Sequence, residues 1–346
     1  MRKAIMILLI VSVLALPVAA TEFTAPQAPD SGEMYMPESI DSFGEGLWYV
    51  VRSALAAIEP EIVQAAGLCV SVIGITLLTS MLQNASSRTK KIAELASAVG
   101  IGILLLQPSG TLIQLGTSTV SEISEYGKLL IPVLTAAVAA QGGVTTSTAL
   151  YTGTTLFCTI LSNLICRLIV PLLYVFLCLC IANSAIGEDL LGKLRDLIKW
   201  LMTWLLKIVL YVFTGYISIT GVVGGSADAS VVKATKLAIS GSVPVVGGIL
   251  SDASEAILVS AGMMKSAAGI YGILAIAATW IGPFLKIGAQ YLLLKLTSAA
   301  CGVFGSKATA NLIRDFSVGM GFVLAAISTI SILLLIGVVC FMKAVT

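Results

Sequence analysis

The sequence contains no histidine, and only 11% of its 346 residues are charged. Histidine is the commonest general base and metal ligand, so its absence argues against most hydrolases and metalloproteases. A soluble domain carries roughly a quarter charged residues, far more than this chain has available to cover a surface. The net charge of +2 is also too small to indicate binding to a nucleic acid.

Motifs for nucleotide binding and catalysis are absent as well. There is no Walker A pattern, no G-x-S-x-G and no H-E-x-x-H. The seven cysteines lie in apolar stretches and form no zinc pattern, and their odd number argues against a complete disulfide framework. The sequence therefore predicts a protein that is not an enzyme and that holds no cofactor and no metal.

Long apolar runs dominate the chain, which is 58% hydrophobic with a mean hydropathy of +1.02. The runs lack the period of two that a transmembrane β-barrel requires. The sequence predicts an all-α polytopic transmembrane helical bundle of about seven to eight membrane segments, some of them broken or re-entrant. The segments are expected at residues 62–82, 92–113, 129–144, 149–182, 201–223, 267–285, 287–304 and 317–342. Residues 149–182 are either two spans that meet near Arg167 or one long kinked helix.

The N-terminus has the pattern of an export signal. Arg2 and Lys3 precede an apolar run at residues 4–16 and small residues that end at Ala20, which predicts a signal peptide over residues 1–20. Residues 21–60 are then an exported polar segment and an interfacial helix. The first part of this segment is rich in proline and acidic residues, which is typical of poorly ordered chain.

The remaining residues, 61–346, are predicted to form the polytopic membrane domain. Arg88, Lys90 and Lys91 follow the first span, and the positive-inside rule makes that loop cytoplasmic, in agreement with an exported N-terminus. Residues 186–200 have apolar side chains at helical spacing opposite charges, which predicts an amphipathic helix on the cytoplasmic surface. It serves either as a strut at the membrane edge or as a docking face for a partner, and the strut is favoured.

A Gly/Thr-rich stretch at residues 142–155 has two interpretations. Its hydroxyls can satisfy an opened backbone, or its small residues can form a packing face between helices. The packing face is favoured.

Residues 241–295 are apolar but carry ionisable groups at intervals, and such groups at bilayer depth are costly and usually functional. A Pro-Val-Val-Gly-Gly break opens this block. Asp252 and Glu255 are three residues apart, so a helix places both carboxylates on one face, where they can bind a cation, relay protons or pair with lysine. The candidate intramembrane polar and structural residues are Arg167, Pro244, Gly247, Gly248, Asp252, Glu255, Lys265, Lys286 and Lys295.

The stretch SVPVVGGILSDASEAILVSAGMMKSAAGIYG at residues 242–272, followed by GPFLKIGAQYLLLKLTSA at residues 282–299, resembles the stage III sporulation protein AE family. The resemblance extends over residues 62–342. It implies a multi-pass protein of the mother-cell membrane around the engulfed forespore. It also implies membership of the stage III A complex, a channel-like apparatus with a separate secretion-type ATPase among its proteins. The family offers no catalytic residues to transfer.

Two other functions remain open. A stand-alone ion-coupled permease is supported by the intramembrane charges, although no internal repeat relates the two halves of the chain. An intramembrane enzyme is the least supported. On the resemblance, Asp252 and Glu255 are expected to organise a broken helix or a subunit contact rather than to catalyse a reaction.

Overall fold

The structure is a computed structural model that describes the backbone of residues 25–37, 42–82, 87–186, 189–242, 247–304 and 307–344. Within these ranges it describes all side chains except those of residues 87–90, 189–190, 220–261, 264 and 304. The expected signal peptide and Pro244 lie outside the described residues.

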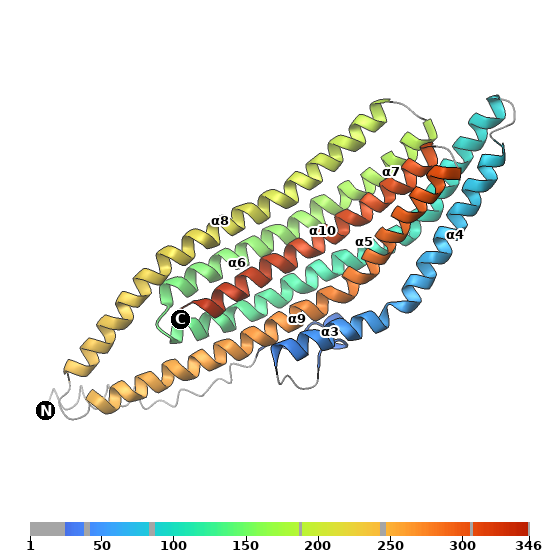
Figure 1. Ribbon diagram of the computed structural model, residues 1–346. Coiled ribbons are helices and arrows are strands. Elements are labelled where there is room, and N and C mark those ends of the chain that lie inside the picture. Colours follow the sequence, from blue (N-terminus) through green and yellow to red (C-terminus); the bar gives the residue numbers. More distant parts are fainter. Residues whose placement is uncertain are drawn as a thin grey trace.

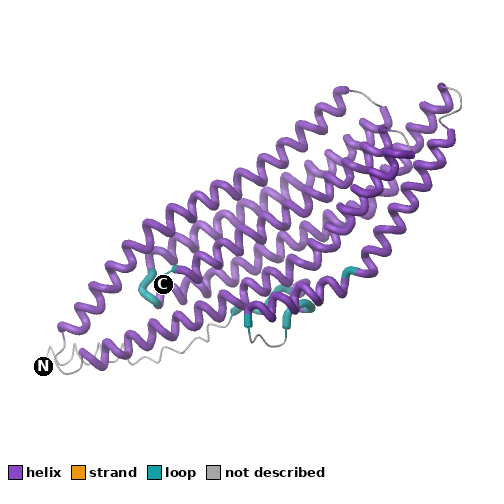
Figure 2. Tube along the Cα trace, in the orientation of Figure 1, coloured by secondary structure: helices purple, strands orange, loops and turns teal. Residues whose placement is uncertain are grey.

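Helices make up the described chain, which contains no strand in those ranges (Figure 2). This confirms the predicted all-α class. The helices are α2 (Asp30–Glu33), α3 (Phe43–Ala57), α4 (Glu59–Leu82), α5 (Ser87–Ala140), α6 (Val144–Leu164), the π-helical turn η1 (Ile165–Ile169), α7 (Val170–Ile186), α8 (Asp189–Ser242), α9 (Gly247–Phe304) and α10 (Lys307–Lys343).

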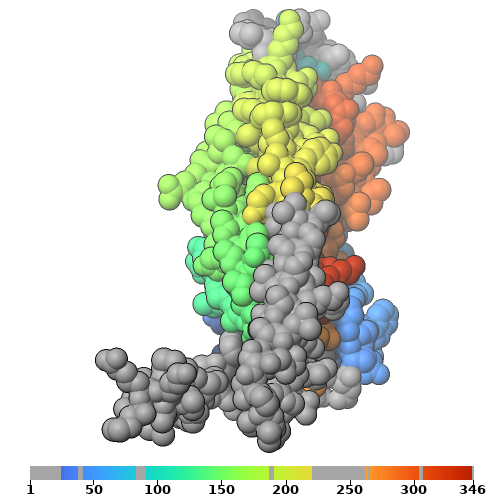
Figure 3. Space-filling model, turned by 90° about the vertical axis from the view of Figure 1, so that its left-hand side faces the viewer, coloured from blue at the N-terminus to red at the C-terminus, as the bar shows by residue number. Residues whose placement is uncertain are grey.

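The long helices run antiparallel in one elongated bundle (Figure 1). The α6, η1 and α7 segments form a single passage along it. Helix α10 lies inside the bundle, where it packs against α5, α6, α7, α8 and α9. Apolar residues dominate α10 beyond its first turns, and Phe316, Ile327 and Phe341 on it are fully buried. Figure 3 shows α8, in yellow, lying beside the green α6 and α7 on one flank.

Six helical segments are long and apolar enough to cross a membrane, judged by length and composition over the described residues. This number is lower than the seven to eight expected, because predicted neighbours are joined. Residues 92–113 lie in α5 together with residues 129–140 of the next predicted segment, whose last residues form the turn into α6. Residues 267–285 and 287–304 both lie in α9.

The polar residues that separate the predicted segments do not interrupt these helices. Thr117 Oγ1 donates to the carbonyl of Ile113 at 2.7 Å, and Thr119 Oγ1 donates to Leu115 at 2.8 Å. Hydroxyls satisfied by the preceding turn can stay inside a helix, so their polarity was a poor sign of a loop. Pro108, Pro132 and Pro283 are likewise contained within helices.

The Gly/Thr-rich stretch at residues 142–155 is a packing face, as favoured. A Cβ on Gly153 would collide with the ring of Tyr216 on α8, and Thr154 is fully buried. Tyr216 Oη donates to the carbonyl of Ala149 at 2.9 Å. Small residues thus let α6 and α8 approach closely.

Residues 25–37, here called the N-terminal strap, correct the expectation of poor order. The strap packs mainly on α9 through α2, and Ala28 and Tyr35 are buried. The backbone N–H of Ala28 donates to Tyr271 Oη at 3.3 Å, and Tyr126 Oη donates to the carbonyl of Pro26 at 3.4 Å. The proline-rich polar composition indicates that this segment cannot form a hydrophobic core by itself. The strap is ordered because its apolar residues pack against the core of the bundle.

Candidate functional site

At one end of the bundle, here called the turn end, α4, α7 and α9 end and α5, α8 and α10 begin (Figure 1). Basic side chains are exposed there, and these are Lys91, Lys193, Lys199, Lys307 and Arg314. The predicted amphipathic helix at residues 186–200 also lies there. Its residues from Asp189 onward form the first turns of α8 and continue into the following apolar stretch without a break.

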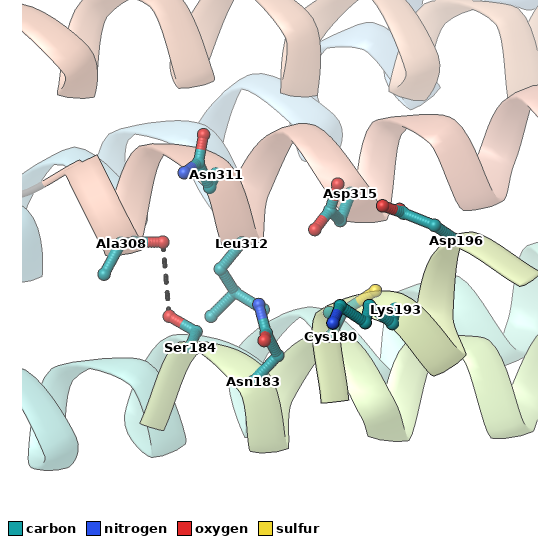
Figure 4. Close-up of a pocket in the computed structure, with 10 residues that line it drawn as sticks. Cys180, Asn183, Ser184, Lys193, Asp196, Ala308, Asn311, Leu312 and Asp315 are labelled. Atoms are coloured by element: carbon teal, nitrogen blue, oxygen red, sulfur yellow. Dashed lines mark hydrogen bonds between the residues drawn. The ribbon is translucent and has the colours of Figure 1, made fainter. Parts of the chain in front are cut away.

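A polar cavity of about 520 Å³ opens between α7, α8 and α10 at the turn end. Figure 4 shows Ser184 of α7 donating its hydroxyl proton to the carbonyl of Ala308, a bond of 3.2 Å. Lys193 and Asp196 of α8 complete the wall beside Asp315 of α10. The cavity therefore offers both donors and acceptors to a polar group that enters it.

Arg195 and Asp315 form an ion pair behind this cavity. Arg195 Nη1 donates to Asp315 Oδ2 at 2.7 Å, and the two side chains are only 17% and 11% exposed. Arg195 also bonds the neighbouring Asp196, whose side chain is 64% exposed. The buried charge on Asp315 is thus paired with a guanidinium from a different helix, and this contact ties α8 to α10.

The three lysines singled out from the sequence have different partners. Lys265 is buried and its Nζ donates to the carbonyl of Ala344 at 2.7 Å, at the end of α10. Lys286 pairs with Glu61 of α4 at 2.8 Å. Lys295 donates to Tyr291 Oη at 3.3 Å and lies over the ring of the same tyrosine.

Arg167 is exposed in η1, near the middle of the apolar segment Val144–Ile186. A π-helical turn inside an α-helix is frequent at functional sites. Gly247 and Gly248 open α9, which also contains Asp252 and Glu255, but the side chains of these four positions lie outside the described residues. The functional reading of this group stays a prediction.

Sequence reasoning did not find Asp315, Glu61 or Gln290. Asp315 falls between the predicted segments 287–304 and 317–342, next to the exposed Arg314, so a buried carboxylate at this position is hard to foresee. Glu61 falls one residue before the predicted segment 62–82. A signal was present in spacing, since Gln290 lies one helical turn from Lys286.

These features define a polytopic helical membrane protein whose ionisable groups pair between helices. Among the described residues, no group of three or more histidine, cysteine, aspartate or glutamate side chains could hold a metal ion. The family model of stage III sporulation protein AE matches residues 37–344. The chain therefore belongs to the stage III sporulation protein AE family.

A curated relative is stage III sporulation protein AE of Bacillus subtilis (strain 168), which is 23% identical over 260 residues. The alignment covers 74% of this chain and 65% of the relative, so slightly less than two thirds of the relative's length is spanned. No solved structure matches the chain.

Proposed function

We propose that the chain is a non-enzymatic integral membrane subunit of the stage III A channel complex that connects mother cell and forespore. Its place is the mother-cell membrane around the forespore, and its role is to sustain forespore development after engulfment. Membership of the stage III sporulation protein AE family carries this proposal.

The antiparallel bundle supports one orientation. The helix ends at the turn end share one side of the membrane, and exposed basic side chains lie close to them. The positive-inside rule makes that side cytoplasmic and the side of α3 external. The turn end and its 520 Å³ cavity then face the mother-cell cytoplasm, where a secretion-type ATPase of the complex would bind.

Arg167 supports a role within a larger assembly. A guanidinium exposed beside apolar side chains in a membrane segment is costly unless a partner group meets it. Leu168 next to it is 41% exposed and Ile160, two turns earlier, is 45% exposed. An acidic or polar group of another subunit would satisfy Arg167 on this face.

Deletion of the gene in the organism that carries it tests the role. A block after engulfment with loss of forespore transcription supports the proposal, and wild-type protein should restore sporulation. A defect restricted to one solute would instead support the alternative, a stand-alone ion-coupled permease.

Orientation is tested by single cysteines in a cysteine-free background, labelled with a membrane-impermeant maleimide. Lys307→Cys should react only after the membrane is permeabilised, and Arg52→Cys on α3 should react in intact cells. The reverse pattern would contradict the proposed orientation.

Assembly is tested by Arg167→Leu, which should keep the protein in the membrane but reduce recovery of the other stage III A proteins after purification. Lys207→Leu is the matched control, since Lys207 is another exposed basic residue in an apolar helix. Equal recovery of the other stage III A proteins with both variants would show that Arg167 does not contribute to the contact with another subunit.

A further inference from the structure

A second polar cavity, of about 370 Å³, lies between α4, α5 and α9, away from the turn-end cavity. Each helix contributes two polar side chains about one turn apart, a spacing that places both on one face. They are Glu61 and Gln64 of α4, Gln107 and Thr111 of α5, and Lys286 and Gln290 of α9. Three apolar helices thus direct polar side chains into one cavity, which is the arrangement expected of a binding site for a polar group.

Gln290 gives this cavity an unmet hydrogen-bonding group. Its side chain is 5% exposed, and its amide nitrogen Nε2 has no hydrogen-bond partner among the described residues. A buried unpaired donor costs free energy, so an acceptor from outside the chain would stabilise it. Lys286 lies one turn away on the same wall, and an anionic oxygen between the two would accept from both.

Glu61 supplies the opposite charge on the facing wall. Its carboxylate is 2.8 Å from Lys286 Nζ, and the two side chains are 37% and 34% exposed, so both can be reached by a ligand. A ligand with an acidic oxygen and an ammonium group would match both charges. An anion alone would leave its negative charge beside Glu61, which disfavours it.

The position of the cavity indicates that the ligand with these two groups is a lipid headgroup. Glu61 is in the first turn of α4, a candidate membrane span of 24 residues, so it lies where a span meets the headgroups. On α4, Val63, Val70 and Leu78 are each about two-thirds exposed. Ala65, Leu68 and Leu112 continue the cavity wall with apolar surface that suits the first carbons of an acyl chain.

We propose that this cavity binds the headgroup of a zwitterionic phospholipid of the phosphatidylethanolamine type. The phosphate accepts from Lys286 and Gln290, and the ammonium group lies against Glu61. The site is independent of the proposed channel role, because it needs only the described contacts of this chain.

Native mass spectrometry of the full chain tests the proposal. The protein in mild detergent is mixed with equimolar phosphatidylethanolamine, phosphatidylglycerol and phosphatidylcholine of matched chains. Phosphatidylethanolamine should be retained most. Gln290→Leu should weaken that retention about tenfold, the effect of losing one hydrogen bond to a charged group.

Gln290→Leu also separates binding from folding. Replacing an unpaired buried amide by an apolar side chain should leave the melting temperature unchanged or raise it, while lipid retention falls. Lys207→Met, on exposed surface away from the cavity, is the control and should change neither. Retention that is equal for the three lipids, or unchanged in Gln290→Leu, would overturn the proposal.

A further experiment with a soluble compound distinguishes binding of a lipid from binding of a free zwitterion with the same groups. Phosphoethanolamine at millimolar concentration should raise the melting temperature less than the lipid does. A rise as large as that from phosphatidylethanolamine would overturn the lipid assignment, as would a preference for phosphatidylglycerol.

Discussion

Arg195 on α8 and Asp315 on α10 are joined by an ion pair of 2.7 Å although 120 residues separate them in the chain. Both side chains are largely buried, so removing one of them leaves the other charge poorly compensated. Asp315 lines the turn-end cavity, and its ion pair with Arg195 holds the first turns of α8 against the central helix α10.

Asp315→Ala should destabilise the fold by about 3 kcal/mol, because it leaves the guanidinium of Arg195 without its buried partner. The measurement is thermal unfolding of the protein in mild detergent. The paired replacement Arg195→Met with Asp315→Leu should recover much of the loss, since it removes both charges together.

Asp196→Ala is the control for this position. Asp196 contacts the same arginine but its side chain is 64% exposed, so its removal should cost less than about 1 kcal/mol. Equal losses from Asp196→Ala and Asp315→Ala would show that burial does not decide the strength of this contact.

Helix class and packing could be predicted from the sequence, and connections could not. Apolar composition predicted the all-α membrane bundle, and small residues at 142–155 predicted a packing face, because both depend on local properties. That α8 is the partner of this face depends on the tertiary fold. The predicted break between residues 113 and 129 failed, since Thr117 and Thr119 satisfy their hydroxyls within α5. Polarity alone cannot distinguish a loop from a helix whose side chains bond their own backbone.

For the site residues too, local features could be predicted from the sequence and tertiary contacts could not. A charged residue in an apolar stretch can be recognised from the sequence alone, which is how Lys265, Lys286 and Lys295 were identified as candidates. Their partners come from α10, from α4 and from the same helix, respectively, and such pairings depend on tertiary contacts. The spacing of Gln290 from Lys286 indicates a shared helix face, but the burial of Gln290 and of Asp315 depends on tertiary packing.

Glu61→Gln should change the stability of the fold by less than about 1 kcal/mol, because an ion pair with both partners about a third exposed contributes little. Unfolding in mild detergent without added lipid measures this value. A loss of several kcal/mol would mean that the Glu61–Lys286 pair is mainly a structural lock between α4 and α9.

Gly153→Ala should destabilise the fold by about 1–3 kcal/mol, since the added methyl group would overlap the Tyr216 ring. Gly288→Ala on α9 is the matched control. No atom lies within 4 Å of a Cβ at that position, so helix propensity should make the change neutral or stabilising by up to about 1 kcal/mol. Similar unfolding temperatures for the two variants would contradict close packing of α6 on α8.

Tyr35→Ala should release the N-terminal strap from α9. The Tyr35 side chain is 6% exposed, and a Cβ on Gly282 would come within 2.9 Å of its ring, so the two residues fit closely. Truncating a buried aromatic side chain costs about 3–5 kcal/mol, and this loss should appear as faster proteolysis within residues 25–37.

Met34→Ala is the control for the strap, because Met34 is adjacent but 70% exposed and should leave proteolysis unchanged. Gly282→Ala should also release the strap in the wild-type background, yet add little when Tyr35 is already alanine. Contacting residues show such non-additive effects, whereas independent ones add. Additive effects of the two changes would mean that the strap is held by contacts other than Tyr35 on α9.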